Sequence, residues 1–214
     1  MKPPEALISI DAAQALYPAS TDPAHDFDHV LRVTAMAERI ARAEGADAAV
    51  VRAAALLHDV GRADASGRDH AEVAAESALD LLRPHAPDKA EAVAQAIRQH
   101  RFRSGPPPDS LEARCLFDAD KLDAIGAIGA ARAFAYAGVI GQRLWAEVAP
   151  DYAERFARGA TQPGEHSSNH EFVVKLSRLR ERMTTRTGRA IAEERHSVMV
   201  SFYERLAREA RGDD

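Results

Sequence analysis

Apolar residues recur every three to four positions along most of the chain, the spacing at which they share one face of an α-helix. The first clear run lies at about residues 28–43, and Gly45 marks its end. The next run predicts a helix that Asp47 caps and that ends at the dipeptide His58-Asp59. The second of these predicted helices therefore ends at a pair of polar residues.

Three more helical runs follow this polar pair. Apolar positions at about residues 70–82 predict one helix, and Asp88 is expected to open the next, with His100 on its apolar face. After a proline-rich loop, Asp109 and Glu112 fit a capping box, in which two side chains bond the free N–H groups at a helix start. The pattern therefore continues to predict helices joined by short polar loops.

The last part of the chain predicts two amphipathic helices, at about residues 169–185 and 189–211, separated by Thr187-Gly188. No long stretch alternates apolar and polar positions in the way that a half-buried strand does. We therefore expect an all-α fold.

The composition limits which classes of protein fit. Apolar residues make up 46% and charged residues 29%, so the chain can bury a substantial core. The net charge of −5 argues against a general nucleic-acid-binding protein, whose surface is usually basic. The single cysteine, Cys115, excludes an intrachain disulfide and suits a reducing cytoplasm. No signal peptide and no run of roughly 18 uncharged apolar residues is found, so we expect a cytoplasmic protein without a membrane span.

His58 and Asp59 are the strongest chemical signal, because imidazole and carboxylate groups both bind first-row divalent metal ions. Neighbouring side chains on a regular helix point about 100° apart, but the backbone at a helix end can turn enough to aim both at one ion. A bare His-Asp pair is more often a packed or capping histidine beside a surface carboxylate. Here the preceding apolar run, the following Val-Gly turn, His29 upstream and Asp120 downstream favour a metal site.

The order His29, His58-Asp59, Asp120 resembles the ligand order of the HD superfamily of metal-dependent phosphohydrolases. The resemblance covers about residues 20–135, and its segments are HDFDHVLRV, ALLHDVGR, DHAEVAAESALDLL, AIRQH and DADKLDAIGAIGAARAF. The last segment and the C-terminal run from NHEFVVKL to SFYERL are similar to a bacterial subgroup of HD hydrolases that includes nucleotide pyrophosphohydrolases.

This resemblance implies a fold, an ion and a reaction. The fold is an HD-type helical bundle forming a single domain over residues 1–214, with a catalytic core at about 20–135 and a helical extension at about 140–214. The reaction is hydrolysis of phosphate esters or anhydrides. The ion is Mn²⁺, Mg²⁺, Co²⁺, Ni²⁺, Fe²⁺ or Zn²⁺, and its implied ligands are His29, His58, Asp59 and Asp120.

His70 and His100 lie where two-metal members of the superfamily have further histidines. Each is interpreted either as a ligand of a second metal or a phosphate contact, or as a side chain that caps or packs within its own helix. Arg101 follows His100 where those members have a second histidine. We therefore expect one tightly bound metal ion.

Positive groups must meet the charge of a phosphate. Arg62 follows the metal loop, Arg101 lies in the loop after the fourth helix, and Lys121 stands beside Asp120. Any single arginine is a surface charge by default, whereas lysines are few in this chain and Lys121 lies inside the ligand motif. The residues expected to take part in catalysis are Asp59, Lys121, Arg62 and His70.

The residues expected to contact the substrate are His100, Arg101, Asp123 and His25. Asp123 lies one helical turn after the ligand Asp120, where it can orient a ligand or Lys121, or cap the turn before the next glycine. His25 lies at the expected mouth of the site, and Asp28, immediately before His29, is interpreted as the helix N-cap.

Three functional classes remain open. The first is a phosphohydrolase of mononucleotides or nucleoside triphosphates, the second a hydrolase of signalling nucleotides such as cyclic nucleotides or alarmones, and the third a non-catalytic regulatory domain. The complete ligand set disfavours the third class, and the missing paired histidines disfavour the second. We expect the protein to bind a small phosphorylated substrate, most simply a nucleotide. The protein partner considered is a second copy of the chain, in a homodimer. We expect binding neither to nucleic acid nor to a membrane.

Overall fold

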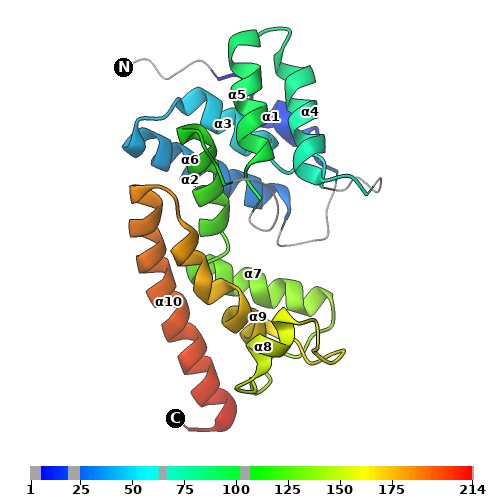
Figure 1. Ribbon diagram of the computed structural model, residues 1–214, viewed down its shortest axis with the longest axis vertical. Helices are drawn as coiled ribbons and strands as arrows, with labels where there is room; N and C mark the ends of the chain where they lie inside the picture. The colour runs from blue at the N-terminus through cyan, green and yellow to red at the C-terminus, as the bar shows by residue number, and fades with distance from the viewer. Residues whose placement is uncertain (1–5, 19–24, 63–66, 102–106, 214) are drawn as a thin grey trace. The chain divides into compact units, whose positions relative to one another are not determined.

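The computed structural model of the protein describes residues 6–18, 25–62, 67–101 and 107–213 (Figure 1). The α-helices in chain order are α1 (Ile10–Gln14), α2 (Phe27–Glu44), α3 (Ala48–Leu57), α4 (His70–Leu82), α5 (Pro87–Arg98), α6 (Leu111–Leu122), α7 (Gly126–Val139), α8 (Tyr152–Ala157), α9 (Ser168–Val174) and α10 (Arg186–Arg211). A 3₁₀ helix, Leu176–Arg182, lies between α9 and α10. No strand occurs in these residues, which confirms the expected all-α class.

The contacts between helices divide the chain into two compact units. The first contains His25–Lys121 and Thr184–Gly188 together with α1, and the second contains Leu122–Met183 and Arg189–Asp214. No single helix of the described part is long and apolar enough to cross a membrane, and one bent pair, α6 with α7, meets the criteria of length and composition. All the site residues expected from the sequence belong to the first unit, except Asp123.

The core of the first unit is built around α3. This helix packs against α1, α2, α4 and α5, and all residues from Ala49 to Leu57 except Arg52 are buried. Its many alanines allow neighbouring helices to approach closely, while burial of a side chain such as Leu56 contributes about 1.5–3 kcal/mol. A helix held on several sides in this way is a rigid support for the two polar residues that follow it.

The ends of α2 and α3 show which expected boundaries were right. Gly45 ends α2 in the left-handed conformation at φ 82°, and the carboxylate of Asp47 accepts the N–H groups of Ala49 and Val50, as predicted. The N-cap expected at Asp28 is wrong. Asp26 caps α2 instead, because its backbone is extended and its carboxylate accepts the N–H of His29 at 2.9 Å.

The expected start of α6 is also wrong in detail. The hydroxyl of Ser110 accepts the N–H of Ala113 at 3.0 Å, whereas the carboxylate of Asp109 binds the side-chain amide of Gln95. Glu112 does not complete a capping box, because its carboxylate accepts the N–H of Asp47. The helix α5 begins at Pro87, one residue before the expected Asp88, without a side-chain cap.

The start of α10 differs most from the sequence expectation. The predicted break at Thr187-Gly188 is wrong, because α10 begins at Arg186 and runs through both residues. The hydroxyl of Thr185 accepts the N–H of Gly188 at 2.9 Å, as an N-cap does. Gly188 is needed here for space, since a Cβ atom would collide with the carboxylate of Asp118. The predicted helix at 169–185 is instead divided into α9 and the 3₁₀ helix.

Asp118, on α6, binds the segment that starts α10. Its fully buried carboxylate accepts four hydrogen bonds, from the backbone N–H and the hydroxyl of both Thr184 and Thr185, at 2.6–3.0 Å. Two N–H donors and two hydroxyl donors balance the buried negative charge. The sequence contained no local sign of this contact, because its partners lie more than 60 positions apart.

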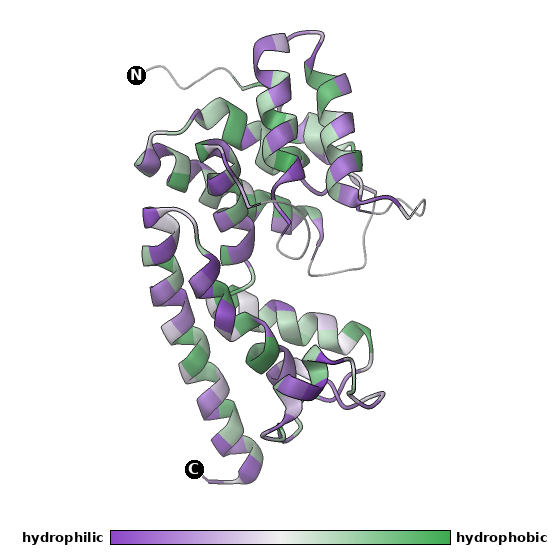
Figure 2. Cartoon of the chain, in the orientation of Figure 1, coloured by the Kyte–Doolittle hydropathy of each residue, from purple (hydrophilic) through white to green (hydrophobic). Residues whose placement is uncertain are grey.

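The second unit is held together by apolar and aromatic contacts. Tyr203 of α10 stacks on Phe172 of α9 with ring centroids 4.4 Å apart, and its hydroxyl lies 2.9 Å from that of Ser168. Apolar and polar residues alternate along α10 in Figure 2, as expected for a helix with one buried face. Asp123 belongs to this unit, where its carboxylate forms an ion pair with Arg132 at 2.8 Å.

Candidate metal centre

The His58-Asp59 pair stands in a turn that is bonded to the end of α3. His58 Nδ1 donates to the carbonyl of Ala55 at 2.8 Å, and the hydroxyl of Tyr17 donates to the carbonyl of Leu56 at 3.0 Å. Carbonyl groups at a helix end have no partner within the helix, so these two contacts satisfy them. The turn that aims His58 and Asp59 in a common direction is therefore held by side chains as well as by backbone. Tyr17 was not singled out from the sequence.

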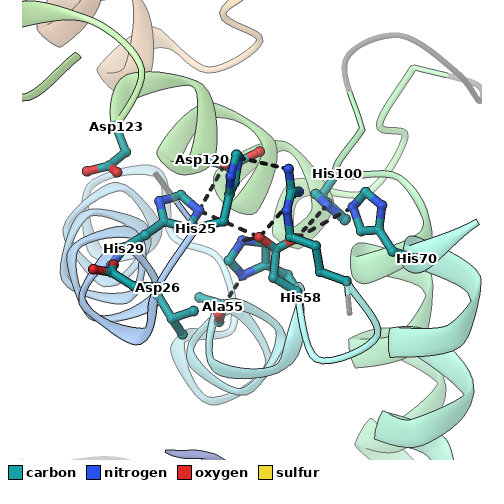
Figure 3. A network of polar contacts seen from close by, with 12 residues as sticks. His25, Asp26, His29, Ala55, His58, His70, His100, Asp120 and Asp123 are labelled. Atoms are coloured by element: carbon teal, nitrogen blue, oxygen red, sulfur yellow. Dashed lines mark hydrogen bonds and ion pairs between the residues drawn. The ribbon is translucent and has the colours of Figure 1, made fainter. Parts of the chain in front are cut away.

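Three donors come together from three helical segments: His29 from α2, His58 after α3 and Asp120 from α6. One ligand-type atom of each lies within 4.8 Å of the others, and His29 Nε2 lies 3.6 Å from Asp120 Oδ1. Figure 3 shows the three side chains directed toward a common centre. Both imidazoles are buried, so the donor atoms are shielded from solvent.

The carboxylate of Asp59 lies close to these three donors and also close to two further histidines. Its Oδ2 lies 3.9 Å from His29 Nε2 and 3.8 Å from His58 Nε2. Its Oδ1 lies 3.5 Å from His70 Nε2 and 3.9 Å from His100 Nε2. Asp59, His70 and His100 thus form a further set of donors close enough to hold an ion, and one carboxylate has an oxygen on each side.

The hydrogen bonds of the histidines leave lone pairs directed at the centre. His58 and His100 each direct Nδ1 at a backbone carbonyl, that of Ala55 at 2.8 Å and that of Ile97 at 2.6 Å. In the neutral ring the proton then resides on Nδ1, and Nε2 carries the lone pair. Within the described part of the chain, His58 Nε2 is buried without a hydrogen-bond partner. A buried acceptor that faces two carboxylates fits a bound cation, which would satisfy all three groups.

The charges of the site also favour binding of a cation. Burial would raise the pKa of Asp59 and Asp120, but the neighbouring histidines and the cations Arg62 and Lys121 hold the pKa of both carboxyl groups well below the usual range. Burial lowers the pKa of His100 to about 3. At neutral pH the carboxylates are therefore ionised and the His100 ring is neutral, the forms in which these groups bind metal ions.

Arg62 lies beside Asp59 and bonds His25. Nη1 of Arg62 lies 3.6 Å from Asp59 Oδ2, and its Nη2 donates to His25 Nε2 at 2.9 Å. The Arg62 side chain is 38% exposed, so it can still meet a substrate from solvent. These contacts place both residues beside the candidate metal centre, and the catalytic role expected for Arg62 and the substrate contact expected for His25 stay predictions.

The remaining residues expected at the site are Lys121, Arg101 and Asp123, and each bonds another group of the protein. Lys121 Nζ donates to Asp120 Oδ2 at 2.6 Å and to the carbonyl of His100 at 3.0 Å. Arg101 binds the carboxylate of Asp69, which caps α4 directly before His70. Asp123 binds Arg132 in the second unit, as described above, so its expected part in orienting a ligand or Lys121 stays a prediction.

Comparisons with known proteins show which family the chain resembles. The family model of the HD domain matches residues 26–125. The chain is 35% identical to the protein YpgQ of Bacillus subtilis (strain 168) over 196 aligned residues. The alignment covers 89% of this chain and 86% of YpgQ.

Solved structures show the same likeness. The crystal structure of Bacillus subtilis YpgQ in complex with ADP has a TM-score of 0.71 and 31% identity, covering 94% of this chain and 92% of that one. An HD-superfamily hydrolase from Bacillus thuringiensis has a TM-score of 0.70 and 30% identity, covering 94% of each chain.

Proposed function

Because the chain belongs to the HD-domain family of metal-dependent hydrolases, we propose that it hydrolyses phosphate ester or anhydride bonds of nucleotides. The observation that supports this most is the donor set of His29, His58, Asp59 and Asp120, in which the buried His58 Nε2 has no hydrogen-bond partner among the described residues. Two imidazoles and two carboxylates suit Mn²⁺, Fe²⁺, Co²⁺, Ni²⁺ or Zn²⁺, and Mg²⁺ remains compatible through the carboxylates.

The bound ion would supply an acidified water and a Lewis acid for the phosphoryl group. The chain's own residues would orient the reactants. Asp59 directs one carboxylate oxygen at each donor group, so it can bind the ion through one and accept a proton from water through the other. His70 stands on the far side of Asp59 Oδ1, with its pKa lowered by burial, and is therefore a neutral acceptor near that oxygen.

We expect one tightly bound ion in the set that contains His58. The set formed by Asp59, His70 and His100 contributes only one negative charge, which it shares with the first set. A single shared carboxylate and two neutral imidazoles bind a second cation more weakly than two carboxylates bind the first. This second set is the place for a weakly held ion or for a phosphate oxygen that bonds the imidazoles.

The nucleotide part of the proposal is supported by the relative. YpgQ of Bacillus subtilis was crystallised with ADP, and its structure covers 94% of this chain. The nucleotides considered are a nucleoside triphosphate, cleaved to monophosphate and pyrophosphate, and a monophosphate, cleaved to nucleoside and phosphate.

A substrate screen tests this proposal. We expect the protein supplied with Mn²⁺, Mg²⁺, Co²⁺ or Ni²⁺ to hydrolyse at least one nucleotide, with phosphate and pyrophosphate measured separately. Release of pyrophosphate alone identifies cleavage between the α and β phosphates. Cleavage of generic phosphate esters but of no nucleotide at millimolar concentration would reject the nucleotide substrate and keep the hydrolase. Cleavage of neither would favour a regulatory domain.

Arg62→Ala should lower kcat/KM by about 10- to 100-fold while the metal content stays unchanged, because Arg62 presents positive charge to the substrate and binds no metal. The matched control is Arg42→Ala, which removes an arginine that is 66% exposed and pairs with Glu38 on its own helix. Steady-state kinetics and elemental analysis of both variants provide the comparison. Wild-type kcat/KM in Arg62→Ala would assign Arg62 to the protein surface.

A further inference from the structure

The side chain of Lys121 bonds neighbouring groups of the protein. It is 12% exposed, and its ammonium lies 5.3 Å from the ring centroid of Phe117 on the preceding turn of α6. Of its three N–H donors, one bonds Asp120 Oδ2 at 2.6 Å and another bonds the backbone carbonyl of His100 at 3.0 Å. This arrangement differs from that of a lysine whose donors are directed at a substrate in solvent.

The two partners of Lys121 belong to the two donor sets. Asp120 belongs to the set with His29 and His58, and His100 belongs to the set with Asp59 and His70. His100 follows the end of α5, so its carbonyl lies outside the helical bonding pattern and needs another donor. The ammonium of Lys121 supplies this donor and thereby ties the segment that carries His100 to α6.

Lys121 also determines how Asp120 faces the centre. The carboxylate gives Oδ2 to the ammonium at 2.6 Å, while Oδ1 lies 3.6 Å from His29 Nε2. With one oxygen held, the carboxylate cannot rotate freely about its last bond. It therefore offers a single, oriented oxygen to the ion, and the positive charge of Lys121 offsets part of the repulsion between two buried carboxylates.

On the basis of the proposed function, we propose that Lys121 is a positioning residue that sets metal affinity by holding Asp120 and the His100 segment in place. This role differs from the phosphate contact expected from the sequence. Loss of a side chain that orients a metal ligand typically weakens metal binding or activity by about 10- to 100-fold. A substrate contact, in contrast, would leave metal binding unchanged.

The experiment compares metal binding and kinetics in Lys121→Met, which keeps the length of the side chain but has no charge and no donor. Mn²⁺ is titrated into metal-free protein without substrate, and kcat and KM are then measured over a range of Mn²⁺ concentrations. We expect Mn²⁺ affinity to fall by about 10- to 100-fold, most of kcat to return at excess Mn²⁺, and KM for the substrate to stay unchanged.

Two further variants complete the test. Lys89→Met is the matched control, because Lys89 lies in the same unit, is 40% exposed and pairs with Asp47 away from the donor sets. It should keep wild-type Mn²⁺ affinity. Lys121→Arg keeps charge and donors and should restore part of the affinity. If Lys121→Met does not fold, Lys121→Gln is tested with the same expectation of weaker Mn²⁺ binding.

The outcomes separate this inference from the proposed function. Wild-type Mn²⁺ affinity in Lys121→Met, with lower kcat or higher KM that excess metal does not restore, would overturn the positioning role and return Lys121 to the substrate. A wild-type protein that binds no Mn²⁺ or other divalent ion would overturn both the inference and the proposed function.

Discussion

Replacing Asp59 by alanine is expected to remove the bound metal ion and to lower turnover on the order of a thousandfold. The two carboxylate oxygens of Asp59 face both donor sets, so its loss affects both at once. A catalytic metal contributes several kcal/mol of transition-state stabilisation, and about 1.4 kcal/mol corresponds to tenfold in rate.

The measurements are elemental analysis of protein purified without chelator, and turnover at saturating substrate. Asp28→Ala is the matched control, since it removes an exposed carboxylate next to His29, one of the proposed ligands, without changing the donor set. Circular dichroism checks that both variants keep their helices. Unchanged metal content in a folded Asp59→Ala protein would contradict the assignment of Asp59 as a ligand.

Asp118→Ala is expected to destabilise the protein by about 3–5 kcal/mol. The carboxylate is fully buried and accepts bonds from the N–H and hydroxyl groups of Thr184 and Thr185. Its removal leaves a cavity and unpaired donors, and each unpaired buried donor costs about 1–3 kcal/mol. For a chain of this length, about 1 kcal/mol lowers Tm by roughly 2–4 °C, so Tm should fall by about 10 °C.

Thermal unfolding of the variant measures this effect. Asp118→Asn should also destabilise, because its amide nitrogen would face donors that need an acceptor. Asp80→Ala, at an exposed position on α4, is the control and should unfold close to the wild-type temperature. A Tm shift in Asp118→Ala no larger than that of Asp80→Ala would show that the four bonds contribute little.

The helices were largely predictable from the sequence because the local spacing of apolar residues determines them. The apolar run that became α3 is buried on several sides, and Gly45 and Asp47 end and begin helices as their backbone preferences require. Capping was less predictable where two acidic residues stand close together. Asp26 and Asp28 are chemically equivalent candidates, and only the extended backbone of Asp26 decides between them.

Gly188 shows why some helix boundaries could not be predicted from local pattern. A glycine usually favours the end of a helix, but this one lies within α10 because the carboxylate of Asp118 occupies the space of a side chain. The reason for this glycine therefore lies on α6, far away in the sequence. The bonds between Asp118 and the two threonines have the same origin, and no local motif indicates them.

The candidate site was predictable in its chemistry and less so in its arrangement. The His58-Asp59 pair and the resemblance to HD hydrolases indicated which residue types would meet, and the donor atoms of His29, His58 and Asp120 do lie together. Spacing along the chain could not show that His70 and His100 face the second oxygen of Asp59. Nor could it show that Lys121 bonds the His100 carbonyl, since this bond joins residues that lie 21 positions apart on different segments.

The most direct test of the metal centre is anomalous X-ray diffraction from crystals of the wild-type protein grown or soaked with Mn²⁺. The account predicts a strong anomalous peak bonded to His29, His58, Asp59 and Asp120, with metal–ligand distances of about 2.0–2.3 Å. A second peak beside His70 and His100 should be weaker or absent. A fully occupied Mn²⁺ bound elsewhere, with no peak among these four residues, would contradict the central claim.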